Sequence, residues 1–128
     1  MNKLSDRYLF RGKRLGDDRW VKGSLVIQHD GRCFIFELCG GLLHEVDPKT
    51  VGQYTGLIDK NGTKIFEGDM LRYGVVGFAD GGFTMGGLWS IDHEIWGGQF
   101  HAEVLGNIHD NPELMGEKQP GTVGGLDE

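Results

Sequence analysis

The chain has 128 residues, enough for one ordinary domain, and 38% of them are hydrophobic. Its 23 glycines follow no three-residue period and are accompanied by only 3 prolines, which excludes a collagen-like chain and proline-rich disorder. The formal net charge of −6 disfavours long-range attraction to nucleic acid or to an anionic membrane.

Short runs of aromatic and β-branched residues, separated by glycine, aspartate and asparagine about every ten residues, predict an all-β, mainly antiparallel fold. The strongest hairpin turn is Asp59-Lys60-Asn61-Gly62, because Asn-Gly suits a tight reversal. We expect bent sheets with a small SH3-like barrel around Gln53–Phe83, on which the final strand closes. In chain order, the predicted strands are Tyr8–Arg11, Arg19–Gln28, Arg32–Leu38, Leu42–Val46, Tyr54–Ile58, Lys64–Phe66, Met70–Val76, Gly82–Met85, Leu88–Ile91 and Gln99–Leu105.

The first third of the chain is basic. Residues 1–40 hold eight basic and five acidic side chains, for +3, whereas residues 41–128 hold five basic and fourteen acidic ones, for −9. Basic residues interleaved with aromatics on a strand are typical of a nucleic-acid surface. The candidate phosphate contacts are Arg11, Lys13, Arg14, Arg19 and Lys22, and the candidate stacking residues are Tyr8 and Trp20.

Two other interpretations of this basic segment stay open. Phe10 and Trp20 can be core anchors of two paired strands whose charged neighbours face solvent. The charge asymmetry can also reflect pairing of basic and acidic segments within the fold or between subunits.

Alternation predicts which strand faces are buried. Phe34, Phe36 and Leu38 share one face of Arg32–Leu38 and the other face is mixed, so we expect this strand to be mostly buried. Phe100, Ala102 and Val104 form the apolar face of the predicted last strand.

Two further predictions concern the cysteines and the segment Asp47-Pro48. Cys33 and Cys39 are about 20 Å apart if the chain between them is extended, so they are poor disulfide partners and are expected in or near the core. Asp47 followed by Pro48 predicts one short helical turn with Asp47 as its cap.

Catalytic motifs are sparse. His93, His101 and His109 recur among acidic residues, but their spacing matches neither a helical H-x-x-x-H pair nor a cysteine-containing metal site. The serines lack a G-x-S-x-G turn, and the glycine-rich segment Gly77–Gly87 lacks the lysine of a phosphate loop. We therefore expect no catalytic residue, no metal site and no cofactor, and we keep a metal-dependent hydrolase that uses these histidines as the least favoured alternative.

A central block resembles a known family. It comprises Gln53–Leu57, Asp59–Gly62 and Ile65–Asp69, and it is similar to the signature of the YopX protein family of bacteriophages and prophages. Further segments that agree with the family in order are Phe10–Arg14, Trp20–Val26 and Glu103–Leu114.

The resemblance implies a small, mainly β, phage-encoded protein that assembles as an oligomer, in a family with no established biochemical activity. It therefore supplies no catalytic residues. The motif residues are expected to be architectural: Asn61 and Gly62 close a hairpin, and Gly68 and Asp69 begin the next strand.

Together these observations favour a phage- or prophage-encoded accessory protein that self-assembles, is not an enzyme and binds an unknown macromolecular partner. Trp89 and Trp96 are candidate oligomer contacts. The leading alternative is a small-barrel nucleic-acid-binding protein that uses the basic first third.

The expected organisation is a single YopX-like domain over residues 1–115 and a disordered, acidic, glycine-rich tail over residues 116–128. No apolar run reaches the length of a membrane span, and residues 1–10 lack the apolar stretch of a signal peptide. We therefore expect a protein without a membrane partner, located in the cytoplasm of the bacterial host cell.

Overall fold

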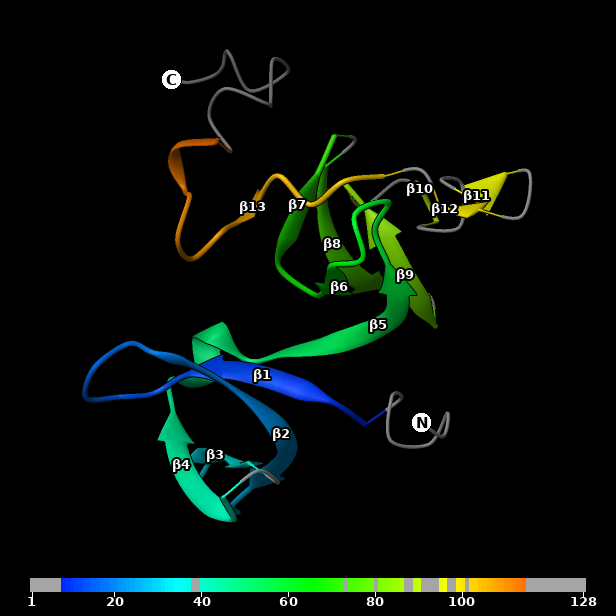
Figure 1. The fold of residues 1–128 in the computed structure, drawn as a ribbon. Helices are drawn as coiled ribbons and strands as arrows, with labels where there is room; N and C mark the ends of the chain where they lie inside the picture. Colours follow the sequence, from blue (N-terminus) through cyan, green and yellow to red (C-terminus); the bar gives the residue numbers. More distant parts are fainter. Residues whose placement is uncertain are drawn as a thin grey trace. The chain divides into compact units, whose positions relative to one another are not determined.

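The structure is a computed structural model that describes residues 8–37, 40–72, 74–79, 81–86, 89–90, 95–96, 99–100 and 102–114. Its strands form a six-stranded, a five-stranded and a two-stranded sheet (Figure 1). The strand pairs are antiparallel throughout the described registers, which confirms the predicted all-β antiparallel class.

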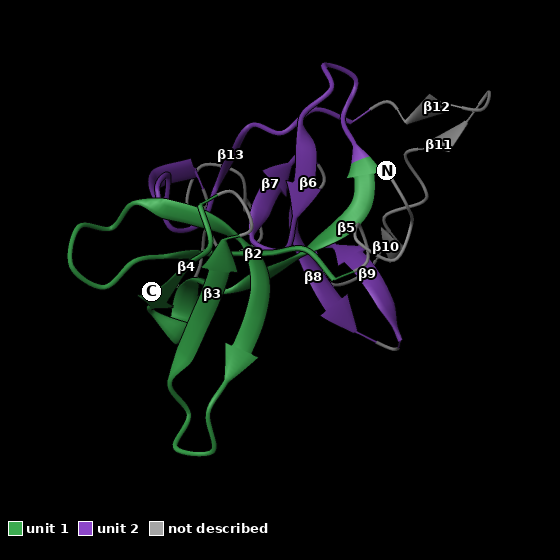
Figure 2. Ribbon diagram, turned by 60° about the horizontal axis from the view of Figure 1, so that its bottom comes forward, with its two compact units in different colours: residues 1–57 green, residues 58–128 purple. Residues whose placement is uncertain are grey.

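The chain divides into two compact units, residues 1–57 and residues 58–128, shown in green and purple in Figure 2. The predicted tail, residues 116–128, lies outside the described residues, of which Leu114 is the last. The organisation into one domain and a tail therefore stays a prediction.

The first unit is built from consecutive hairpins. The six-stranded sheet has the order β4-β3-β2-β1-β5-β6, in which all strands but β6 begin in this unit. Their bounds, with the single-turn helix η1, are β1 Phe10–Lys13, β2 Trp20–Ile27, β3 Cys33–Glu37, β4 Leu42–Val46, η1 Pro48–Thr50 and β5 Gly52–Ile58.

The core of the first unit lies on one face of these strands. Val21, Ile35 and Val46 are 2%, 0% and 0% exposed, and the free cysteine Cys33 is buried with them, as predicted. The expectation that strand β3 is mostly buried is wrong at Phe36, whose side chain is 37% exposed. Alternation places Phe36 on the face opposite Cys33 and Ile35, and the core uses the smaller residues of that strand.

The short helical turn is confirmed. Asp47 caps η1 by accepting a hydrogen bond from the backbone N–H of Lys49 at 3.0 Å, and Pro48 occupies the first turn. The buried Thr50 hydroxyl accepts from the backbone N–H of Lys13 at 2.8 Å and donates to the Asp47 carbonyl at 2.7 Å. These bonds tie η1 to the end of β1.

The second unit contains shorter strands. Their bounds are β6 Lys64–Phe66, β7 Asp69–Leu71, β8 Gly74–Ala79, β9 Gly82–Met85, β10 Trp89–Ser90, β11 Ile95–Trp96, β12 Gln99–Phe100 and β13 Gly106–Asn107. The five-stranded sheet has the order β10-β9-β8-β7-β13, and β11 pairs with β12. The buried apolar residues of this unit are Ile65, Phe66, Met70, Leu71, Val76, Met85 and Ala102.

Several predicted strands differ from the observed ones by one or two residues at an end, and two predicted strands differ by more. The run Met70–Val76 is the hairpin β7–β8, in which Leu71 pairs with Gly74. Of the run Gln99–Leu105, Gln99–Phe100 forms β12, and the described residues 102–105 precede β13 without strand geometry. Trp89 and Trp96 lie in β10 and β11, but their side chains are outside the described part of the structure.

The predicted SH3-like barrel is not found, because the described strands form no closed barrel. Strands β5 and β6 belong to one sheet, whereas β7, β8 and β9 belong to another. The break falls at the turn between β6 and β7, where Gly68 has φ of +92° and the Asp69 carboxylate accepts the backbone N–H of Phe66 at 2.8 Å. The side chain of Asp69 therefore accepts a backbone N–H group of β6 at this point. No helix among the described residues is long and apolar enough to cross a membrane.

Candidate nucleic-acid interface

The strand register brings four of the predicted residues together on one face. Arg11 of β1 lies opposite Lys22 of β2, and Lys13 lies opposite Trp20. Directly opposed residues of an antiparallel pair project to the same side of the sheet. We call Arg11, Lys13, Trp20 and Lys22 the basic face; it lies on the side of the sheet opposite the buried Val21.

The indole ring of Trp20 is the centre of the basic face. The guanidinium carbon of Arg11 lies 4.6 Å from the ring centroid, and the Nζ of Lys13 lies 5.5 Å from it, so both cations make cation–π contacts. Arg11 is only 8% exposed, whereas Lys22 is exposed. Arg11 therefore supports the ring from within the fold, and Lys22 is the cation best placed to meet an anion in solvent.

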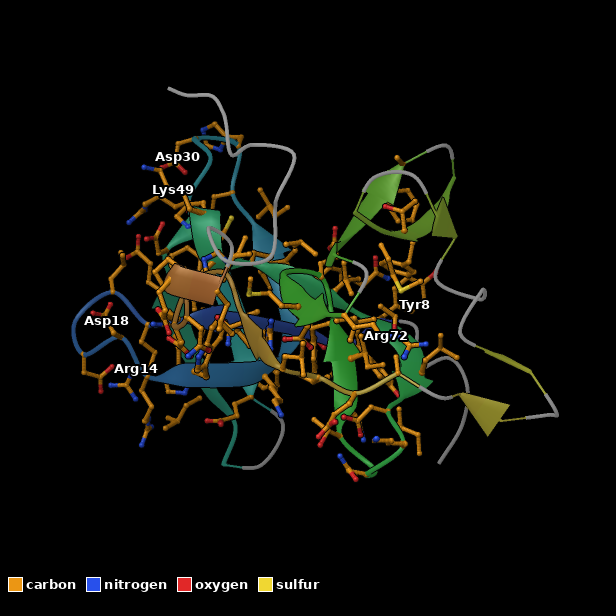
Figure 3. All side chains as sticks on the ribbon, turned by 90° about the horizontal axis from the view of Figure 1, so that it is seen from above. Tyr8, Arg14, Asp18, Asp30, Lys49 and Arg72 are labelled. Carbon is orange, nitrogen blue, oxygen red and sulfur yellow. The ribbon has the colours of Figure 1, made fainter. Side chains whose placement is uncertain are left out.

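Arg14 and Arg19 lie apart from the basic face, at the two ends of the loop between β1 and β2. The Nε of Arg14 pairs with the Asp17 carboxylate at 3.3 Å, and the same carboxylate accepts the backbone N–H of Arg19. Arg14 and Asp18 are labelled in this loop in Figure 3. Two arginines and two aspartates balance each other there, so the loop contributes no net positive charge.

Two aromatic residues of the strand that was expected to be mostly buried, Phe34 and Phe36, lie on the same side of the sheet as the basic face. Phe36 pairs with Ser24, and Phe34 pairs with Val26, on the β2 residues that alternate with the buried ones. We call Phe34 and Phe36 the aromatic extension. The alternation of both strands separates these two faces, but it does not say which face the core covers.

Charges at the margin of the aromatic extension are mostly balanced. Arg32 lies 5.7 Å from the ring centroid of Phe34, and its Nε pairs with the Asp30 carboxylate at 3.2 Å. The backbone N–H of Arg32 is the main cause that lowers the pKa of Asp30, so this carboxylate stays charged beside the arginine. Glu45 of β4 lies opposite Phe34. The margin of the aromatic extension therefore carries charges of both signs.

The hairpin at Asn61 and Gly62 is organised by a buried carboxylate. Asp59 is 4% exposed, and its Oδ1 accepts the backbone N–H of Asn61 at 2.8 Å and of Thr63 at 2.9 Å. Its Oδ2 accepts the backbone N–H of Val104 at 3.0 Å, from 45 residues further along the chain. Gly62 has φ of +88°, which favours glycine.

Burial of the carboxyl acts to raise the pKa of Asp59, but the three backbone N–H donors outweigh it and the net effect lowers the pKa. Asp59 is therefore an anion that joins two distant parts of the second unit. Its three backbone partners indicate a structural role.

The other family motifs are also architectural. Asp69 is 2% exposed and pairs with Asn107 across β7 and β13. The Oδ1 of Asn107 accepts the backbone N–H groups of His109 and Asp110, both at 2.9 Å, which shapes the turn after β13. His109 is thus part of a turn, whereas His93 and His101 lie outside the described residues. Within the described part of the chain, no group of three or more His, Cys, Asp or Glu side chains is arranged to hold a metal ion.

The chain matches a model of a known protein family. A family model described as YopX protein matches residues 10–116. The match includes the hairpin at Asp59 and the turn at Asn107 that are described above. No curated protein matches the chain.

Proposed function

The chain belongs to the YopX protein family, and on that premise we propose that it is a phage- or prophage-encoded accessory protein of the bacterial host cytoplasm. It acts as a non-enzymatic binding module that self-assembles. The resemblance of its motifs supports the phage origin, and the architectural use of those motifs supports a role in binding instead of catalysis.

The observation that carries self-assembly is the edge strand β4. β4 is the outermost strand of its sheet, and its first two residues, Leu42 and Leu43, are 58% and 55% exposed. Only its later part is covered in the described structure, where the backbone N–H of Leu15 donates to the Glu45 carbonyl. An exposed apolar edge without proline or lysine favours pairing with the same strand of a second copy.

A charge on this edge is expected to dissociate the assembly. We expect the parent protein to sediment as an oligomer and Leu43→Lys to shift it toward the monomer by at least tenfold in the dissociation constant, because a buried lysine opposes apolar strand pairing. Ile58→Lys, at an isoleucine of β5 that is 49% exposed, is the matched control and should leave the mass unchanged. A parent protein that is monomeric at all concentrations in light scattering contradicts self-assembly.

A second candidate function is nucleic-acid binding at the basic face. The observation that favours it is the register that places Lys13, Trp20 and Lys22 side by side. Phosphate contacts and an aromatic ring on one sheet face are the usual elements of such a surface.

Removal of two lysines is expected to weaken this binding. Lys13→Ala with Lys22→Ala should lower the affinity for a labelled oligonucleotide at least fivefold at about 50 mM salt, since each lost phosphate contact removes counterion release. Lys60→Ala, at an exposed lysine of the second unit that pairs with Glu103, is the control. Equal affinity of the double variant and the parent in fluorescence anisotropy contradicts the candidate site.

A further inference from the structure

One side of the first sheet runs from the basic face to the aromatic extension. Strand β2 takes part in both, because its first residues pair with β1 and its last residues pair with β3. Along β2 the side chains of Lys22, Ser24 and Val26 are exposed, while the residues between them are buried or half-buried. One uninterrupted strand therefore connects the cations to the phenylalanine rings.

We propose that this surface is a track for single-stranded nucleic acid, with the phosphates at the basic face and the bases over the aromatic extension. The inference rests on the second candidate function above and names its ligand. Charge complementarity identifies the polyanion, since the cations gather on β1 and β2 while Glu45 and the Asp30–Arg32 pair lie at the aromatic end.

The aromatic rings distinguish a single strand from a duplex. Phe36 is 37% exposed and Val26, nearby on the same face, is 43% exposed, so an apolar surface is open to solvent. Phe34 and Phe36 are two residues apart on one strand, which corresponds to about 6.6 Å. Bases stacked in a duplex are about 3.4 Å apart and hide their faces, whereas an extended single strand can place separate bases on separate rings.

The small number of cations on the basic face also favours a single strand over a duplex. Two lysines on the basic face account for a salt dependence of about −1.4 in the logarithm of affinity per logarithm of salt concentration, at about −0.7 for each phosphate on a single strand. A protein with a net charge of −6 gains little from charge alone, so base stacking must supply much of the affinity. A duplex offers no exposed base faces and would bind more weakly.

The test compares a labelled oligothymidylate with a duplex of equal length at about 50 mM salt, using fluorescence anisotropy. Phe36→Leu keeps an apolar side chain but removes the ring, and Phe36→Tyr keeps the ring. We expect Phe36→Leu to weaken binding of the oligothymidylate about tenfold and Phe36→Tyr to preserve it. Phe78→Leu, at a phenylalanine of β8 that is 56% exposed in the second unit, is the matched control and should bind like the parent.

The outcomes separate the single-stranded track from nucleic-acid binding in general. Tight binding of oligothymidylate that depends on the ring at position 36 supports the single-stranded track. Duplex binding that equals or exceeds it, with no effect of Phe36→Leu, overturns the track but leaves nucleic-acid binding standing. No binding of either probe overturns the nucleic-acid candidate and the track with it. Thermal unfolding of each variant shows whether a loss of binding reflects a loss of fold.

Discussion

Replacing Asp59 by asparagine is expected to destabilise the protein by about 3 kcal/mol at neutral pH. The carboxylate of Asp59 accepts three backbone N–H groups in a site that is 4% exposed. An asparagine amide can still accept at one oxygen, but its Nδ2 then faces the backbone N–H of Val104, so two donors meet and one buried bond is lost. Urea unfolding of parent and variant measures the difference in free energy.

The control for this substitution is Asp17→Asn. The Asp17 carboxylate also accepts a backbone N–H, from Arg19 at 3.2 Å, but it is exposed to solvent. Water can replace the lost interaction there, so the expected change is within about 0.5 kcal/mol. Equal effects of the two substitutions contradict the structural role of the buried carboxylate.

The effect of Asp59→Asn is also expected to depend on pH. The pKa of Asp59 is lowered below its ordinary value of 3.8, so the unfolded chain takes up the proton before the folded protein does. The stability that the carboxylate supplies is therefore fully present above pH 3.8 and is lost as the pH falls through the lower pKa of the folded state. The difference between parent and Asp59→Asn should be constant from neutral pH down to this value and shrink below it.

Gly23→Ala is expected to destabilise the first unit by about 3 kcal/mol or more. A Cβ at this position would lie 2.0 Å from the backbone carbonyl oxygen of Phe36 and 2.8 Å from its carbonyl carbon. Backbone atoms of a paired strand cannot rotate away as a flexible side chain can, so β2 and β3 must separate. Thermal unfolding followed by circular dichroism reports the loss as a lowered Tm.

Gly16→Ala is the matched control in the same unit. Nothing lies within 4 Å of a Cβ at Gly16, so an alanine there meets no neighbour. We expect its free energy of unfolding to stay within about 0.5 kcal/mol of the parent value. If Gly23→Ala is as stable as Gly16→Ala, the close approach of β2 to β3 is not present in solution.

Much of the local structure follows from sequence because it depends on neighbouring residues. The cap of η1 at Asp47, the hairpin at Gly62 and the strands Leu42–Val46, Lys64–Phe66 and Gly82–Met85 all have the expected bounds. Turn residues and short alternating runs indicate these features from the local sequence. The family resemblance is confirmed for the same reason, since its motifs are continuous in the chain.

The pairing of distant strands could not be predicted in the same way. Alternation separates Phe36 from Ile35 but does not say which of their two faces the core covers. The expected barrel is not found among the described strands, where β5 and β6 lie in one sheet and β7 pairs with β8 and β13 in another. Both outcomes depend on partners that are remote in the chain.

The sequence by itself therefore determined the class of fold, the positions of the turns and the family. Tertiary structure alone decided which side chains share a face: it grouped Lys13, Trp20 and Lys22 through the register of β1 and β2, and it placed Arg14 in a neutral loop. It also revealed that Asp59 reaches Val104. The physical reason is that composition and local spacing fix backbone conformation, whereas a shared surface or a buried charge is defined by side chains that long-range strand pairing brings within a few ångströms.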